Sequence, residues 1–281
     1  ELLAAEDGAV GRLTTQKRSE VVANAFDRHF GGYSPEELSS LSDSDIGLYF
    51  RAAELVLSNS LRKKDLERME VAFSEILRRG LGSDRAVHGM HSAYISMRMF
   101  DQARELTRRH GLRLVEDDPS YLNNVPAEFQ GPTMLEISLA APQLTRTAFV
   151  PPTGGHIVVV AHPLCHFSQR AMVAINGDAT LRALFEERAS LLAPVDASLN
   201  LDVLRTWNST FPAFQVALAY SRDEWPAIDY WGTPTFYFFG AGGNIEKIVG
   251  WPPEGRLEEL RAAARRVGIL ADEQSPSSKE L

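Results

Sequence analysis

The sequence predicts an α/β domain in the C-terminal half, preceded by an α-helical N-terminal domain. Up to Gly111, apolar residues recur with helical period and prolines are few. Beyond Asp118, prolines become frequent and short runs of β-branched and aromatic residues occur. We therefore expect a helical domain over residues 1–111, a linker over 112–132, an α/β domain over 133–271 and a disordered polar tail over 272–281.

Composition narrows the class of protein. The chain has 281 residues, 44% of them hydrophobic and 23% charged, which is ordinary for a globular protein that buries a core. Its net charge of -8 argues against a nucleic-acid binder, which usually carries a basic face. No apolar run is long enough to span a bilayer, and we expect no cofactor. The single cysteine excludes an intramolecular disulfide.

The N-terminal region predicts helices over residues 16–29, 45–58, 61–79, 84–97 and 101–110. Ser34 followed by Pro35 and two glutamates is typical of a helix start, because serine caps the first N–H groups and proline suits the first turn. Gly111 is expected to end the last of these helices. The predicted helix over residues 61–79 has one apolar face, which is formed by Leu66, Met69, Phe73, Ile76 and Leu77.

A short motif suggests that these helices form a repeat. Ala93 and Tyr94 stand before a predicted turn, and Phe100 is followed three residues later by Ala103. This spacing resembles the helix-turn-helix junction of a tetratricopeptide repeat, and a fainter echo lies about 31 residues upstream, around Ala72. A repeat-like array and an unrelated small bundle both stay open.

The C-terminal half predicts strands at residues 133–139, 145–150, 156–161, 190–195, 235–239 and 245–251. The continuous β-branched run at 156–161 is typical of a buried central strand. Helices are expected over residues 169–175, 178–189, 199–207 and 256–267, and we interpret 214–220 as a further helix.

Cys165 lies between the predicted central strand and the next helix, so it falls in the first helical turn. Free N–H groups and the positive end of the helix dipole stabilise a thiolate there, which lowers the pKa of the thiol and makes it nucleophilic. A lone cysteine is also often a small buried hydrophobe. A second, distant element favours the functional interpretation.

That element is Thr233-Pro234, which opens the predicted hairpin of residues 235–251. Strand, cysteine-bearing helix, Pro-initiated hairpin and last helix together resemble the thioredoxin family, and the added segments resemble its TlpA/ResA-type branch. The resemblance implies a cis peptide bond at Thr233-Pro234, whose backbone edge binds a substrate peptide as an added strand. It also implies thiol-disulfide exchange with a partner protein and an exported, periplasmic location.

The chain departs from that family at the second cysteine of its motif. Cys165-His166-Phe167-Ser168 keeps the attacking thiol, but a serine cannot resolve a mixed disulfide. Ser168 and His166 are the residues we expect to activate the thiol, the first by a hydrogen bond and the second by its charge.

Several outcomes stay open for this site. The protein exchanges disulfides as a monothiol, or captures partners in lasting mixed disulfides, or has kept the fold as a redox-inactive binding scaffold. A copper or zinc site made by His162, Cys165 and His166 is a further alternative. The helical region is expected to help recruit the partner.

Overall fold

The computed structural model describes residues 13–31, 33–114, 116, 118–196 and 198–271, and the chain forms two compact units. The first comprises residues 1–121 with 195–200, and the second comprises residues 122–194 with 201–281. The tail predicted to be disordered, residues 272–281, lies outside the described residues. Within the described chain, no helix has the length and apolar character needed to cross a membrane.

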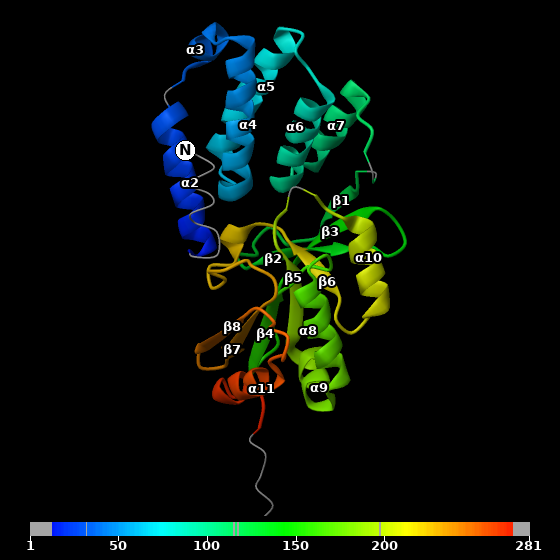
Figure 1. Ribbon diagram of the computed structural model, residues 1–281. Helices are drawn as coiled ribbons and strands as arrows, with labels where there is room; N and C mark the ends of the chain where they lie inside the picture. The colour runs from blue at the N-terminus through cyan, green and yellow to red at the C-terminus, as the bar shows by residue number, and fades with distance from the viewer. Residues whose placement is uncertain (1–12, 32, 115, 117, 197, 272–281) are drawn as a thin grey trace, which may run out of the picture. The chain divides into compact units, whose positions relative to one another are not determined.

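The first unit is helical (Figure 1). It contains α2 (Thr15–Phe30), α3 (Pro35–Ser40), α4 (Asp43–Ser60), α5 (Lys63–Arg78), α6 (Asp84–Ser96) and α7 (Phe100–His110). The five helices predicted by periodicity are confirmed to within two residues at each end.

Local capping explains where these helices begin and end. The Ser34 hydroxyl accepts the N–H of Glu37 at 3.2 Å, while the Glu37 carboxylate accepts the N–H of Ser34 at 2.7 Å. This reciprocal pair satisfies two N–H groups that have no partner inside the helix. Gly111 ends α7 in the left-handed conformation, with φ of 60°, as the sequence indicated.

The core of this unit is built from the apolar stripes of α2, α4, α5 and α6. The predicted face of α5 is buried at Leu66, Met69, Phe73 and Ile76. Ala93, Phe100 and Ala103 are also buried, where α6 meets α7. The tetratricopeptide resemblance itself stays a prediction.

A buried carboxylate, Asp65, ties the start of α5 to its neighbours. It accepts hydrogen bonds from the Ser60 hydroxyl at 2.6 Å, from Arg62 Nε and Nη2 at 2.6 and 3.0 Å, and from Arg68 Nη1 at 3.0 Å. The buried charge is therefore both hydrogen-bonded and paired, which is the condition for burying it at tolerable cost.

The second unit is organised by a mixed sheet in the order β1-β3-β2-β6-β5-β4-β7-β8. Its strands are β1 (Ser120–Asn123), β2 (Thr133–Ile137), β3 (Gln143–Ala148), β4 (Gly155–Val160), β5 (Ala189–Ala193), β6 (Val216–Ala219), β7 (Thr235–Gly240) and β8 (Ile245–Val249). β4 pairs in parallel with β5, and β7 pairs antiparallel to both β4 and β8. Residues 157–160 of β4 are fully buried, which confirms the predicted central strand.

Helices α8 (His166–Gly177), α9 (Ala179–Arg188), α10 (Leu201–Thr210) and α11 (Leu257–Arg266) lie beside this sheet (Figure 1). The strand β1 falls inside residues 112–132, which the sequence indicated to be irregular linker. β1 pairs with β3 at the edge of the sheet. This contact is distant in sequence, so the local pattern of residues 112–132 did not predict a strand there.

The prediction of a helix over residues 214–220 is wrong, because this segment contains β6. β6 pairs in parallel with β5 and antiparallel to β2, so its backbone is hydrogen-bonded to a neighbouring strand on both sides. The buried side chain of Asn208 in α10 adds two hydrogen bonds to it. Asn208 Nδ2 donates to the Val216 carbonyl at 3.1 Å, and the Val216 N–H donates to Asn208 Oδ1 at 2.7 Å.

We expect Asn208→Ala to lower the free energy of unfolding by about 2 kcal/mol, since it leaves a buried N–H and a buried carbonyl of Val216 without these partners. Urea unfolding followed by tryptophan fluorescence measures the change. Ser209→Ala, next along α10 and exposed, is the matched control. Equal midpoints for the two variants would show that the Asn208 side chain does not hold β6.

Candidate functional site

Cys165 lies at the N-cap of α8, directly after the loop that follows β4. Its N–H donates to the His162 carbonyl at 2.9 Å, which closes the turn between strand and helix. The thiol is free and half-buried. The sequence prediction that Cys165 stands at the start of the helix is therefore confirmed to within one residue.

Thr233 lies against the thiol although 68 residues separate the two in sequence. The Cys165 Sγ is 3.3 Å from the Thr233 carbonyl oxygen, to which the neutral thiol donates. The Thr233–Pro234 peptide bond is cis, and the Pro234 carbonyl accepts the N–H of Gly250 at 2.8 Å. The fold thus brings together the cysteine and the Thr-Pro pair that the sequence analysis singled out.

Opposing effects act on the pKa of the Cys165 thiol. Burial raises it, since a half-buried thiolate loses hydration. A hydrogen bond from the Thr233 side chain lowers it, as do the backbone N–H and hydroxyl of Ser168 and the N–H of Phe167. The lowering effects prevail, so the pKa of Cys165 lies below its usual value. The donors are those expected where a helix begins.

Ser168 is fully buried, one turn into α8. Its Oγ lies 3.4 Å from the His162 nitrogen and accepts that N–H. A hydroxyl carries one hydrogen, and with its acceptor side used this hydrogen is left for the sulfur. Hydrogen bonding from Ser168 lowers the pKa of the Cys165 thiol, and Ser168 stands three residues after the cysteine, where a resolving thiol would stand.

His166 is exposed, and its ring lies on that of Phe167 with centroids 3.9 Å apart. Within the described chain it forms no hydrogen bond or ion pair with the thiol. Its electrostatic effect on Cys165 stays a prediction.

The alternative metal set of His162, Cys165 and His166 does not come together. Among the described residues, no three His, Cys, Asp or Glu side chains form a group that could hold a metal ion. His162 Nδ1 accepts the N–H of Leu164 at 3.1 Å, which engages a ring nitrogen inside the loop. The described residues therefore give this alternative no support.

A pocket of about 360 Å³ lies beside Thr233 and Pro234. Its walls include Phe167, Tyr230 and Trp251, so aromatic side chains line it from three separate segments.

Arg170 holds one wall of that pocket in place. Its guanidinium lies 5.4 Å from the ring centroid of Phe167 and donates to the Trp251 carbonyl at 3.1 Å. Arg170 and Trp251 could not be identified as site residues from the sequence, because only the folded chain brings the end of β8 to α8.

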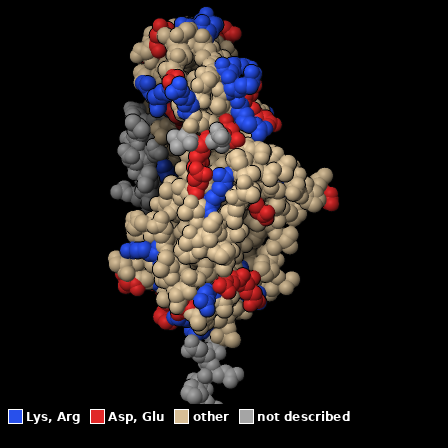
Figure 2. Space-filling model, turned by 90° about the vertical axis from the view of Figure 1, so that its right-hand side faces the viewer, with Lys and Arg blue, Asp and Glu red and all other residues tan. Residues whose placement is uncertain are grey.

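Surface charge on the face shown in Figure 2 is divided into separate clusters. Lys and Arg side chains stand next to Asp and Glu side chains, and no continuous basic strip crosses this face. The view agrees with the acidic net charge of -8.

No protein-family model and no curated protein matches the chain. Among solved structures, the chain is similar to a thioredoxin-like protein from Bacteroides caccae, with 10% sequence identity and a TM-score of 0.30, over 83% of this chain and 89% of that chain. A TM-score that low carries no argument for function, so the assignment of the fold rests on this chain's own topology.

That topology is thioredoxin-like. The sheet segment β5-β4-β7-β8 has the cysteine-bearing helix α8 after β4, a cis proline directly before β7, and α11 after β8. This is the layout that the sequence analysis compared with the thioredoxin family. The sheet is larger than that segment, since β6, β2, β3 and β1 extend it beyond β5 to eight strands.

Proposed function

We propose that the protein reacts through Cys165 with thiols or disulfides of a partner protein, by monothiol exchange or by capture in a mixed disulfide. The observation that supports this most directly is the setting of the thiol. It is half-buried beside the Thr233 carbonyl, and donors from Ser168 and Phe167 lower its pKa. A buried cysteine that served only for packing would not need them.

The chemistry follows from a single thiol. The Cys165 thiolate attacks one sulfur of a partner disulfide, an S–S bond forms between the two proteins, and the partner's second sulfur leaves as a thiolate that takes a proton from water. Ser168 has no sulfur with which to break the new bond. An external thiol, a small thiol or a partner cysteine, must attack it to restore the free Cys165 thiol.

The Thr233 backbone is the edge on which we place the partner peptide. Its carbonyl faces the Cys165 thiol, and its N–H makes no hydrogen bond with any residue that the structure describes. An extended segment can pair with this N–H while its sulfur approaches Cys165. The pocket beside Pro234 then receives an apolar side chain of the partner.

The strand pair β2–β3, added outside the thioredoxin-like segment, supports our proposal of a TlpA/ResA-type relationship. Disulfide chemistry of this kind persists in oxidising compartments. We therefore propose an exported protein, acting in the bacterial periplasm.

The pH dependence of thiol alkylation tests the proposal. A lowered pKa means that thiolate is retained at lower pH than in a free cysteine, and reactivity is lost only as the pH falls through the lowered value. We expect the rate of iodoacetamide reaction to reach half its plateau below about pH 8.5, the midpoint of an unperturbed thiol. A midpoint at or above that value would favour the redox-inactive scaffold.

Adduct formation supplies the second measurement. The wild-type protein, mixed with a fluorescent peptide disulfide, is expected to give a labelled band on non-reducing electrophoresis that disappears with a reducing agent. Cys165→Ser removes the only thiol and is expected to give no band. A wild type that alkylates but forms no adduct would contradict the exchange mechanism.

A further inference from the structure

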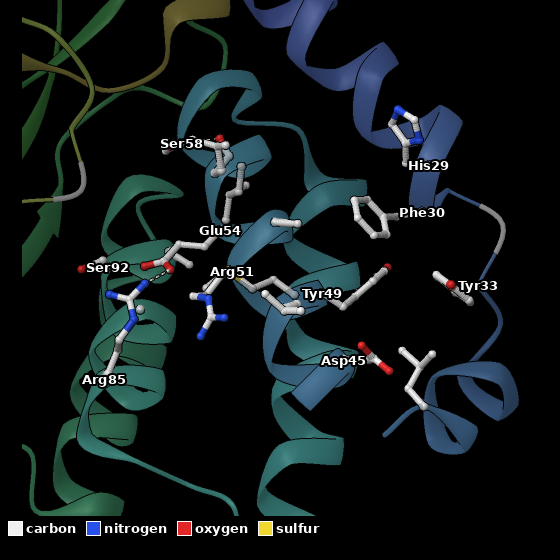
Figure 3. A pocket seen from close by; sticks show the side chains of 18 of the residues that line it. His29, Phe30, Tyr33, Asp45, Tyr49, Arg51, Glu54, Ser58, Arg85 and Ser92 are labelled. Carbon is white, nitrogen blue, oxygen red and sulfur yellow. Dashed lines mark hydrogen bonds and ion pairs between the residues drawn. The ribbon is translucent and has the colours of Figure 1, made fainter. Parts of the chain in front are cut away.

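A pocket of about 1210 Å³ lies wholly within the helical unit. Side chains of α2, α4 and α6 line it, with Leu48 and Ala93 among them. Figure 3 labels Phe30 of α2, Arg51 of α4 and Ser92 of α6. We refer to this pocket as the α4 groove. It is larger than the roughly 300–1,000 Å³ of ordinary small-molecule pockets.

The floor of the groove is the outward face of α4, which is unusually apolar. Leu48, Ala52 and Leu55 follow one another at the i, i+4, i+7 spacing of a single helix face. Leu48 is 52% exposed, and Tyr33 at the edge of the groove is 40% exposed.

The opposite face of α4 carries Ile46 and Phe50 and is already buried in the core. A helix that is apolar on both sides is expected to have a partner on both sides. On the side toward the groove, Ala52 and Leu55 are only partly buried and Leu48 is exposed.

The dimensions of the groove suit a helix. An α-helix with its side chains is about 10 Å across and rises about 1.5 Å per residue, so roughly ten residues fill this volume. Gly89 lets α6 approach α4 closely, since a Cβ there would lie 2.9 Å from Glu54 Oε1.

The charged side chains differ between the two sides of the groove. Arg85 pairs with Glu54 at 3.1 Å, whereas Arg51 forms no ion pair or hydrogen bond with any described residue. Figure 3 shows Arg51 on the same side of the groove as Arg85, with Asp45 on the other side near Tyr33. One side of the groove thus holds an excess of positive charge and the other side holds a carboxylate.

We propose that the α4 groove binds an amphipathic α-helix of a partner protein. About three turns of that helix lay apolar residues at i, i+4 and i+7 on Leu48, Ala52 and Leu55, and an acidic residue pairs with Arg51. The inference concerns a surface of the helical unit and is independent of the chemistry of Cys165.

A charge-swap experiment with the full chain tests it. The probes are two fluorescein-labelled stapled helices of about 12 residues, identical in their three leucines, one with glutamates along one flank of the leucine row and the other with lysines there. Fluorescence anisotropy is expected to show that wild type binds the acidic helix at least about 10-fold more tightly than the basic one. Arg51→Glu is expected to reverse this preference.

Matched variants separate the groove from other surfaces. Arg28→Glu changes an exposed arginine of α2 that does not line the groove, and is expected to bind as wild type does. Ala52→Trp fills the floor and is expected to abolish binding of both helices, with an unchanged unfolding temperature as the check on folding. Cys165→Ser is expected to bind both helices as the wild type does. Loss of helix binding would therefore be distinguishable from loss of the thiol chemistry.

Three results would overturn the proposal. One is equal affinity for the acidic and basic helices in wild type. Another is that the Ala52→Trp variant still binds both helices while the wild type binds dodecanoate saturably, which would assign the groove to a lipid chain. The third is concentration-dependent self-association in sedimentation that Leu48→Asp removes, which would assign it to a second copy of this protein.

Discussion

The Ser168→Cys variant is expected to release a mixed-disulfide partner at least about 100-fold faster than the wild type when no external thiol is present. The Ser168 side chain acts on the pKa of Cys165 from the first turn of α8, so we expect a sulfur at this position to start within reach of the thiol. Its attack on Cys165 Sγ forms an intramolecular disulfide and expels the partner's sulfur as a thiolate. The wild type lacks this route and must wait for an outside thiol.

The measurement begins with protein carrying a fluorescent peptide in disulfide linkage to Cys165. After removal of free thiols, the fraction of peptide still attached is followed by gel filtration. Ser168→Ala is the matched control, because it also removes the hydroxyl but adds no sulfur. It is expected to hold the peptide as wild type does and to alkylate more slowly at pH 7, since the loss of a donor raises the pKa of Cys165.

Equal lifetimes of the adduct in Ser168→Cys and Ser168→Ala would contradict this account of the site. They would mean that the first turn of α8 does not present position 168 to Cys165 during the reaction. The resemblance to dithiol proteins would then be confined to the fold.

The second large effect is expected in the helical unit. Asp65→Ala should lower its free energy of unfolding by about 3 kcal/mol, because two arginines and a serine lose a buried carboxylate that accepts from all of them. Part of that loss is offset, since Arg62 and Arg68 are 33% and 22% exposed and regain water, and Arg68 keeps its pair with Asp27 at 2.7 Å.

Urea unfolding monitored by circular dichroism measures the effect, with the midpoint of the helical signal as readout. Glu67→Ala, two residues along α5, is the control, since its carboxylate is 56% exposed and lies 3.7 Å from Lys63. That control is expected to change stability by less than about 0.5 kcal/mol. A loss for Asp65→Ala no larger than the loss for Glu67→Ala would show that the Asp65 network is not a stabilising element.

Much of the fold was accessible from the sequence where the signal is local. Ser34 with Pro35 and Glu37 predicted a helix start, and the structure contains the corresponding capping box. The β-branched run before Cys165 predicted the central strand, and the cysteine stands at the helix start as expected. Each of these depends on neighbours within a few residues.

The features that could not be predicted depend on contacts between residues distant in sequence. β6 reads Val-Ala-Leu-Ala, which has no strong strand preference, and only β2, β5 and Asn208 make it a strand. The buried role of Asp65 is invisible in a pattern where acidic residues at a helix start are expected on the surface. The donor role of Ser168 was predicted, but its full burial follows from packing around the first turn of α8.

The two hydrogen bonds between Asn208 and Val216 have a practical consequence for the choice of expression host. Asn208, Ser209 and Thr210 spell an acceptor sequence for N-linked glycans. In a eukaryotic secretory pathway the sugar is attached while the chain is still unfolded, to the same amide nitrogen that donates to the Val216 carbonyl. A glycan there has no room beside β6, so glycosylated chains would be unable to complete the sheet, and a bacterial host avoids this loss of material.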